Sequence, residues 1–174
     1  MKKRVSVVLI ALIAIPAFCF AAVAAPQIFT FAGHNDVMTL DVSQMNDEMS
    51  ALVMYALNEA LIRNSYNNII PGLAGSFDVS EDGTVYTFHL RDAKWSDGVP
   101  VTAKDFEYSF LRTLNPETGS SQVSEFDSVL NAKAYYSGEI TDTSLVGIKA
   151  FDDRTLIITL AYSDPFFISE MAEG

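Results

Sequence analysis

The residues with the clearest chemical potential are acids placed next to a glycine, as in a calcium-binding loop. Asp78, Ser80 and Asp82 alternate as the first oxygen ligands of an EF-hand do, and a glycine follows directly. The twelfth position of such a loop holds a bidentate glutamate, but here it is His89. The residues on either side alternate between apolar and polar, which is typical of strands. The pattern therefore favours a turn between two strands over a calcium site.

Histidines and catalytic motifs give no sign of an active site. His34 and His89 are the two histidines, and their spacing does not fit a pair of metal ligands. His89 stands between Thr87 and Arg91 on the predicted outward face of a strand, where a solvated or hydrogen-bonded histidine is expected. The sequence has no motif for a nucleophilic serine, a phosphate-binding loop or a dinucleotide-binding loop. We therefore predict a protein that is not an enzyme and uses no metal or cofactor.

The first 24 residues have the features of a secretory signal peptide. Basic residues at positions 2–4 precede an apolar run from Val5 to Ala25, and Ala22-Val23-Ala24 offers a cleavage site with small outer residues. An uncleaved membrane anchor is the alternative, because a run of about 20 apolar residues can span a bilayer. Pro16 and the alanine-rich end of the run favour cleavage.

Cleavage after Ala24 would leave a strongly acidic chain of 150 residues without cysteine. Cys19 is the only cysteine, and Phe18 precedes it where lipid-attachment sites require a small residue. Disulfides, thiolate metal sites and a cysteine nucleophile are therefore excluded from the mature chain. Cleavage removes three basic residues and no acid, so the formal net charge changes from −11 to −14. Such acidity argues against nucleic acid or an anionic membrane surface as a partner.

Hydrophobic periodicity predicts a helix early in the mature chain. Apolar residues recur at helical spacing from Met49 to Leu61, over three turns. Asn46 or Asp47 is expected to cap this helix, and Asp47 and Glu48 suit the positive end of its dipole.

Alternating apolar residues predict strands and hairpins. The expected segments are a weak strand at 27–32, a hairpin at 77–90 with its turn at 80–83, and a hairpin at 146–160 with its turn at 152–153. Trp95 follows the first hairpin and is predicted to fill the core rather than to stack on a ligand.

Three further helices are predicted. A capping box of Thr102 and Asp105 starts the first, which ends at Asn115-Pro116. The second carries its apolar stripe from Val123 to Ala134 and stops at Gly138. The third begins at Asp164-Pro165, and its two phenylalanines, at positions 166 and 167, have no predicted partner to cover them.

Several motifs in this order resemble one known family. The stretch YTFHLRDAKWSDGVPVTAKDF, from Tyr86 to Phe106, closely resembles the signature region of the family 5 solute-binding proteins, the oligopeptide and dipeptide receptors of ABC importers. The region from Leu40-Asp41 to Ala60-Leu61 resembles the family's first ligand-cleft segment and the helix after it. Pro71-Gly72-Leu73-Ala74 resembles the entry to the family's first hairpin, and the segment from Ile148 to Leu156 resembles its later hairpin.

The resemblance implies a mixed α/β fold of the periplasmic binding protein type. Members have two lobes joined by a hinge (the type II arrangement), with an extra domain inserted into the first lobe. They are much longer than this chain, so we expect a truncated version of that fold. The expected division is a signal peptide at 1–24, the start of the first lobe at 25–60, the inserted domain at 61–144 and a return to the first lobe at 145–174.

The same resemblance implies transport of a solute. The expected function is capture of peptides, oligopeptides above all, in the periplasm or outside the cell envelope, and their delivery to permease subunits in the cytoplasmic membrane. Main-chain hydrogen bonds would hold an extended peptide between closing lobes. A receptor of this family for nickel or another small solute is the alternative. A secreted hydrolase, with its catalytic residues outside this sequence, is the more remote one.

Four residues are candidates for ligand contact by this resemblance. Asn46, Asp47 and Glu48 fall where the backbone of the family's first lobe meets the peptide. A helix cap with acids at the positive end of the dipole explains these three equally well. Gln122 falls where oligopeptide receptors commonly have a tyrosine that touches the ligand.

Overall fold

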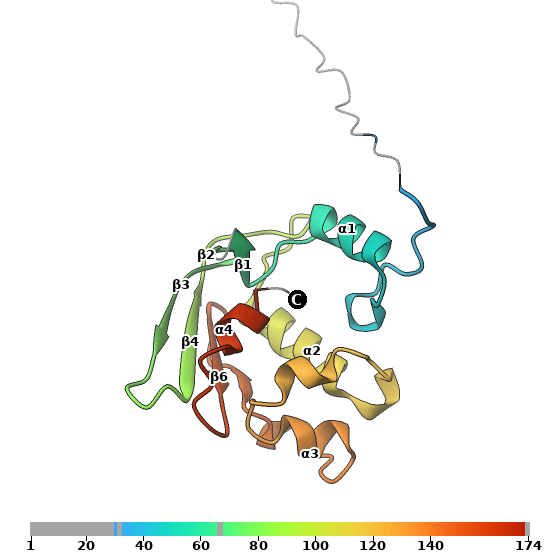
Figure 1. The fold of residues 1–174 in the computed structure, drawn as a ribbon. Helices are drawn as coiled ribbons and strands as arrows, with labels where there is room; N and C mark the ends of the chain where they lie inside the picture. Colours follow the sequence, from blue (N-terminus) through green and yellow to red (C-terminus); the bar gives the residue numbers. More distant parts are fainter. Residues whose placement is uncertain (1–29, 31–32, 66–67, 173–174) are drawn as a thin grey trace, which may run out of the picture. The chain divides into compact units, whose positions relative to one another are not determined.

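The computed structural model describes residue 30 and residues 33–65 and 68–172 (Figure 1). Contacts divide the chain into two units, Met1–Ala32 and Gly33–Gly174, and the second contains all the described helices and strands. The predicted signal peptide lies outside the described residues, and so does the predicted strand at 27–32 apart from Thr30. No helix among the described residues is long and apolar enough to cross a membrane.

Helices and strands alternate irregularly along the second unit. The helical elements, with 3₁₀ turns written η, are η1 (Val42–Gln44), α1 (Glu48–Leu57), α2 (Ala103–Leu114), η2 (Pro116–Thr118), η3 (Val123–Phe126), α3 (Ala132–Tyr136), η4 (Thr143–Leu145) and α4 (Phe167–Glu170). The strands are β1 (Ile62–Ser65), β2 (Asn68–Pro71), β3 (Ala74–Val79), β4 (Val85–Leu90), β5 (Ile148–Ala150) and β6 (Thr155–Thr159).

Four of the strands form one antiparallel sheet in the order β3-β4-β6-β5. Phe88 lies inside this sheet, opposite Phe77 on β3 and Leu156 on β6. Both predicted hairpins are confirmed, and the first turns at Gly83 with a φ of 70°, which glycine adopts without strain. Because β3–β4 and β5–β6 share this sheet, the segments 61–144 and 145–174 share one hydrophobic core.

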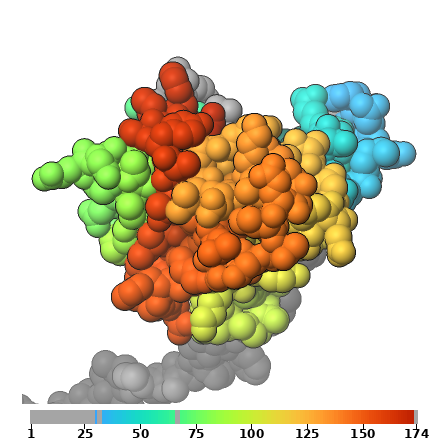
Figure 2. Space-filling model, turned by 90° about the horizontal axis from the view of Figure 1, so that it is seen from below, coloured from blue at the N-terminus to red at the C-terminus, as the bar shows by residue number. Residues whose placement is uncertain are grey.

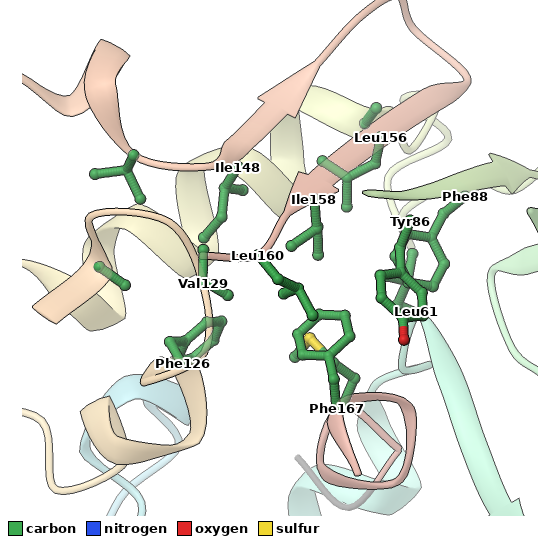
Figure 3. Close-up of a cluster of buried hydrophobic side chains, with 14 of the residues drawn as sticks. Leu61, Tyr86, Phe88, Phe126, Val129, Ile148, Leu156, Ile158, Leu160 and Phe167 are labelled. Atoms are coloured by element: carbon green, nitrogen blue, oxygen red, sulfur yellow. The ribbon is translucent and has the colours of Figure 1, made fainter. Parts of the chain in front are cut away.

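One face of the sheet is covered by helices (Figure 3). Alternate residues of β4 and β6, among them Phe88 and Ile158, are fully buried there. Phe167 of α4 packs on Tyr86, with 4.8 Å between the ring centroids, and is itself fully buried. The expectation that Phe167 lacks a covering partner is therefore wrong, while Phe166 is indeed 70% exposed.

The edge strand β5 is closed by a side chain from α2. The backbone amide of Ala150 donates a hydrogen bond of 3.2 Å to Glu107 Oε2. The ammonium group of Lys149 lies 3.5 Å from Oε1 of the same carboxylate. Glu107 thus satisfies one edge amide and keeps β5 from offering it to another chain.

The helix α2 agrees with its prediction. Thr102 and Asp105 form the expected capping box, with Asp105 Oδ2 accepting from the Thr102 amide at 2.7 Å. The ends of its apolar stripe, Ala103 and Leu114, are fully buried, and the helix ends at Asn115 as predicted. Trp95, in contrast, is 47% exposed at a turn closed by the Trp95–Val99 hydrogen bond, so its predicted core position is wrong.

Three helix predictions need correction. The helix predicted over 49–61 ends at Leu57, since the carbonyls of Ala60 and Leu61 accept hydrogen bonds from the amides of Leu73 and Ala74. The helix predicted from Val123 onward is split into η3 and α3 by Asn131, whose φ is 58°. The last helix begins at Phe167, two residues later than predicted.

Candidate functional site

A polar anchor fixes the segment before α1 to the helix α2. The guanidinium of Arg112 donates two hydrogen bonds to Asp41, at 2.7 Å to Oδ1 and 2.5 Å to Oδ2. The amide of Ser43 donates a third to Oδ1, at 3.1 Å. Hydrogen bonding from Arg112 lowers the pKa of Asp41 below its ordinary value, and the same contact raises the pKa of Arg112. Both groups are therefore charged across the neutral pH range.

Two further contacts extend this anchor along η1. The hydroxyls of Ser43 and Thr113 are both buried and lie 2.9 Å apart. The side-chain amide of Gln44 donates to the carbonyl of Thr118. Residues 41–44 are thereby tied to the end of α2 and to the turn that follows it.

An open groove lies beside this anchor. It has a volume of about 620 Å³. Its lining residues are Gln44, Tyr108, Leu111, Arg112, Asn115, Glu117, Thr118, Tyr135 and Thr143. The groove offers hydroxyl, amide, carboxylate and guanidinium groups, with Leu111 as its one aliphatic residue, a combination that suits binding of a polar solute. None of the four predicted ligand residues belongs to this lining.

The three consecutive candidates lie at the start of α1. Asp47 is the N-cap, which decides between the two predicted caps, and its Oδ1 accepts from the Ser50 amide at 2.8 Å. Hydrogen bonds from the Ser50 side chain and amide lower the pKa of Asp47. Its other oxygen, Oδ2, is buried without a hydrogen-bond partner among the described residues. Asn46 and Glu48 are exposed beside it.

Gln122 stands apart from these three in the sequence and caps η3. It is half-buried, and its backbone amide donates to the Ser120 hydroxyl at 3.1 Å. The Gln44–Thr118 contact joins its segment to that of Asp47. The structure therefore places the segments of Asp47 and Gln122 in the same region. Among the described residues, no contact is shown between Gln122 and the other three candidates.

The acids that resembled a calcium loop serve the β3–β4 turn instead. Asp82 Oδ1 accepts hydrogen bonds from the hydroxyls of Ser80 and Thr84, at 2.6 and 2.8 Å. Asp78 Oδ2 pairs with His89 Nε2 at 2.8 Å on the open face of the sheet, so the prediction of a hydrogen-bonded surface histidine is confirmed. Among the described residues no group of three histidines, cysteines or acids is placed to hold a metal ion.

Comparison with known proteins agrees with this fold and its motifs. The family model "bacterial extracellular solute-binding proteins, family 5 Middle" matches residues 68–173. A probable deoxycholate-binding periplasmic protein of Escherichia coli is 35% identical over 150 residues, which are 84% of this chain and 28% of that protein. A dipeptide-binding protein of Lactococcus lactis is 40% identical over 139 residues, 79% of this chain and 25% of that protein.

A solved structure shows the same arrangement of elements. The substrate-binding domain of an oligopeptide ABC transporter from Bacillus anthracis matches with a TM-score of 0.79 and 37% identity, over 86% of this chain and 29% of that one. The mixed α/β fold is therefore that of the oligopeptide-binding type, as predicted. The chain spans about a quarter of the length of the curated relatives that it matches. It belongs to the bacterial extracellular solute-binding proteins of family 5.

Proposed function

We propose that this chain is part of the substrate-binding component of an ABC importer that captures peptides, oligopeptides above all, and delivers them to permease subunits. The observation that carries the proposal is similarity over 86% of the chain to the substrate-binding domain of an oligopeptide ABC transporter. The dipeptide-binding relative supports the same ligand class. The proposed place of action is the periplasm or the exterior of the cell envelope.

The proposed mechanism is binding without chemistry. Peptide main-chain groups would pair with the protein as an added strand does, and closure of two lobes would enclose the ligand. The subdivision at 25–60, 61–144 and 145–174 remains our proposal for how this chain contributes to the lobes. Because closure needs contacts from both lobes, we expect residues 1–174 alone to bind peptides weakly or not at all.

Asp47 is the strongest of the proposed ligand residues. Its buried Oδ2 lacks a donor among the described residues, and buried acceptors are normally paired. A peptide amide would supply such a donor, once a local rearrangement of the protein exposed this oxygen to the ligand. Asn46, Glu48 and Gln122 are proposed as its neighbours at the ligand, and the groove beside Arg112 is a second surface for the same solute.

The test is ligand identification on the product of the intact reading frame. Native mass spectrometry of the purified protein should reveal co-purified peptides, and calorimetry should give saturable binding of unlabelled di- to pentapeptides. Nickel and deoxycholate are the comparison ligands, since the family alternative is a small solute and one relative is a probable deoxycholate-binding protein. Saturable binding of either of these without any peptide binding would refute the peptide proposal. Peptide cleavage during the incubation would favour the hydrolase instead.

A further inference from the structure

The groove beside Arg112 is lined, among the described residues, by one cation, one carboxylate and two aromatic rings. Arg112 and Glu117 carry the charges, and the rings are those of Tyr108 and Tyr135. Its volume of about 620 Å³ falls within the range of about 300–1,000 Å³ that is typical of ligand pockets. Figure 2 shows the yellow segment at the end of α2 beside the orange segment of α3 and η4, and these segments together supply most of the lining.

The positive charge of Arg112 is already compensated. Both terminal nitrogens of its guanidinium donate to the carboxylate of Asp41, at 2.7 and 2.5 Å. Paired charge-assisted hydrogen bonds of this kind are among the strong polar contacts of proteins. An anionic ligand would have to compete with this carboxylate for the guanidinium. The groove is therefore poorly suited to an anion.

The carboxylate of Glu117, in contrast, has no ion-pair partner in the part of the chain that the structure describes. The residue is exposed, and its backbone amide donates to Asn115 Oδ1 at 2.9 Å, which fixes the turn of η2 that carries it. The uncompensated charge at the groove is thus negative. The chain as a whole has a net charge of −11, so its field also attracts cations.

The two tyrosines add a second feature that favours a cation. The face of an aromatic ring is negative and attracts an ammonium or guanidinium group. Tyr108 is 70% exposed on α2, and its hydroxyl makes no hydrogen bond among the described residues. Tyr135 lines the groove from α3 and is 8% exposed. An exposed ring and an unpaired carboxylate in one groove match a basic group more closely than a neutral one.

We propose that this groove binds a basic side chain of the peptide ligand, with the Glu117 carboxylate as its counter-ion and the Tyr108 ring as the surface on which the cation packs. The inference rests on the peptide-binding function proposed above and adds a sequence preference to it. Main-chain pairing holds different sequences alike, so a preference for lysine or arginine requires a side-chain pocket such as this one. A free alkyl diamine carries the same ammonium group, and the test separates the two sources.

The test compares matched peptides on the product of the intact reading frame. Trialanine with one lysine at the first, second or third position is titrated calorimetrically, and so are the same peptides with glutamine in place of lysine. The free-cation probe is 1,5-diaminopentane. The protein variants are Glu117→Gln and Tyr108→Leu. Glu81→Gln, at the β3–β4 turn, is the matched control, because it removes one exposed acid outside the groove.

The measured quantity is the Kd of the glutamine peptide divided by the Kd of the lysine peptide. At the position that reaches the groove this ratio should be about tenfold, from about fivefold for an exposed charge pair and about twofold for a ring contact. Glu117→Gln should reduce the ratio to about twofold and Tyr108→Leu to about fivefold, whereas Glu81→Gln should keep the wild-type ratio. The wild-type ratio should also fall at about 1 M salt, because salt screens exposed charges.

Cysteine labelling locates the bound side chain. Thr143 lines the groove and is exposed, so Thr143→Cys, with Cys19→Ser as background, reports access to the groove. A saturating lysine peptide should slow maleimide labelling of this cysteine at least about threefold, because a bound ligand covers the surface of its pocket. Labelling of Glu81→Cys should not change.

Four results would contradict the inference, and they have different consequences. A ratio near one at all three positions, with the peptides still bound, would overturn it and leave the peptide function standing. A lysine preference that Glu117→Gln does not reduce would overturn it in the same way. Diamine binding that depends on Glu117, without a lysine preference among the peptides, would assign the groove to a free cation. Binding of none of the peptides would refute the proposed function, and this inference with it.

Discussion

The carboxylate of Asp41 and the guanidinium of Arg112 meet in a two-point contact across 71 positions of the chain, at 2.7 and 2.5 Å. The pair joins the segment before α1 to the last turn of α2. Two parallel N–H···O bonds fix direction as well as distance, which a single contact does not. The position of η1, and of the proposed ligand residues after it, therefore depends on this pair.

We predict that this pair makes stability depend on acid pH. Folding lowers the pKa of Asp41 because Arg112 stabilises the charged carboxylate, so the group contributes stability above its ordinary pKa of 3.8. That contribution is lost as the pH falls through the lower folded value. Asp41→Asn should therefore show a smaller difference in unfolding free energy between pH 7 and pH 3 than the wild-type chain, measured by urea titration.

Asp92→Asn is the control for this measurement. Asp92 pairs with Arg154 at the surface and is 88% exposed, where an ion pair contributes little to stability, so Asp92→Asn controls for the loss of one surface acid. If Asp41→Asn retained the wild-type difference, the contact with Arg112 would contribute nothing to acid sensitivity.

We predict that the buried hydroxyl pair of Ser43 and Thr113 contributes to the unfolding free energy at neutral pH. Ser43→Ala removes the partner of the Thr113 hydroxyl, which is 6% exposed and would be left unsatisfied. The expected loss is about 1–3 kcal/mol of unfolding free energy. The double variant Ser43→Ala/Thr113→Val removes both hydroxyls and should lose less than the sum of the single variants. Strict additivity in denaturant titrations would show that the two hydroxyls do not interact.

Neighbouring phenylalanines provide a test of the core. Phe167 is fully buried against Tyr86, whereas Phe166 is 70% exposed. Phe167→Ala should lower the unfolding free energy by about 3–5 kcal/mol through lost burial and a cavity. Phe166→Ala should change it by less than about 0.5 kcal/mol. Equal effects of the two substitutions would mean that α4 does not hold its described position.

Local features of the fold were predictable where the signal is contained in a few consecutive residues. The turn around Gly83 and the capping box of Thr102 and Asp105 depend on contacts within a few positions, and both were predicted correctly. The length of α1 was not, because the Ala60 and Leu61 carbonyls pair with residues 73 and 74. Asn131, with its φ of 58°, interrupts a stripe that otherwise has helical spacing.

The site was less predictable than the fold. Asp41 and Arg112 are ordinary surface residue types, and no local pattern indicates that they meet. The groove beside them likewise combines residues from η1, α2 and the later turns. Asn46, Asp47, Glu48 and Gln122 came from a resemblance, and the structure supplies their surroundings without testing their contact with a ligand.

Substitutions at Asp47 separate a structural role from ligand binding. Asp47→Ser keeps a side-chain acceptor for the Ser50 amide but removes the negative charge and the Oδ2 acceptor, whereas Asp47→Ala removes the cap as well. If Asp47 binds peptide, both variants of the full-length product should bind about tenfold more weakly, the loss expected for one hydrogen bond to a charged group. Gln122→Ala, made in parallel, tests the second segment in the same calorimetric titration. If peptide affinity fell only in Asp47→Ala, together with the stability of the folded state, the residue would be a helix cap and the proposed ligand contact would be wrong.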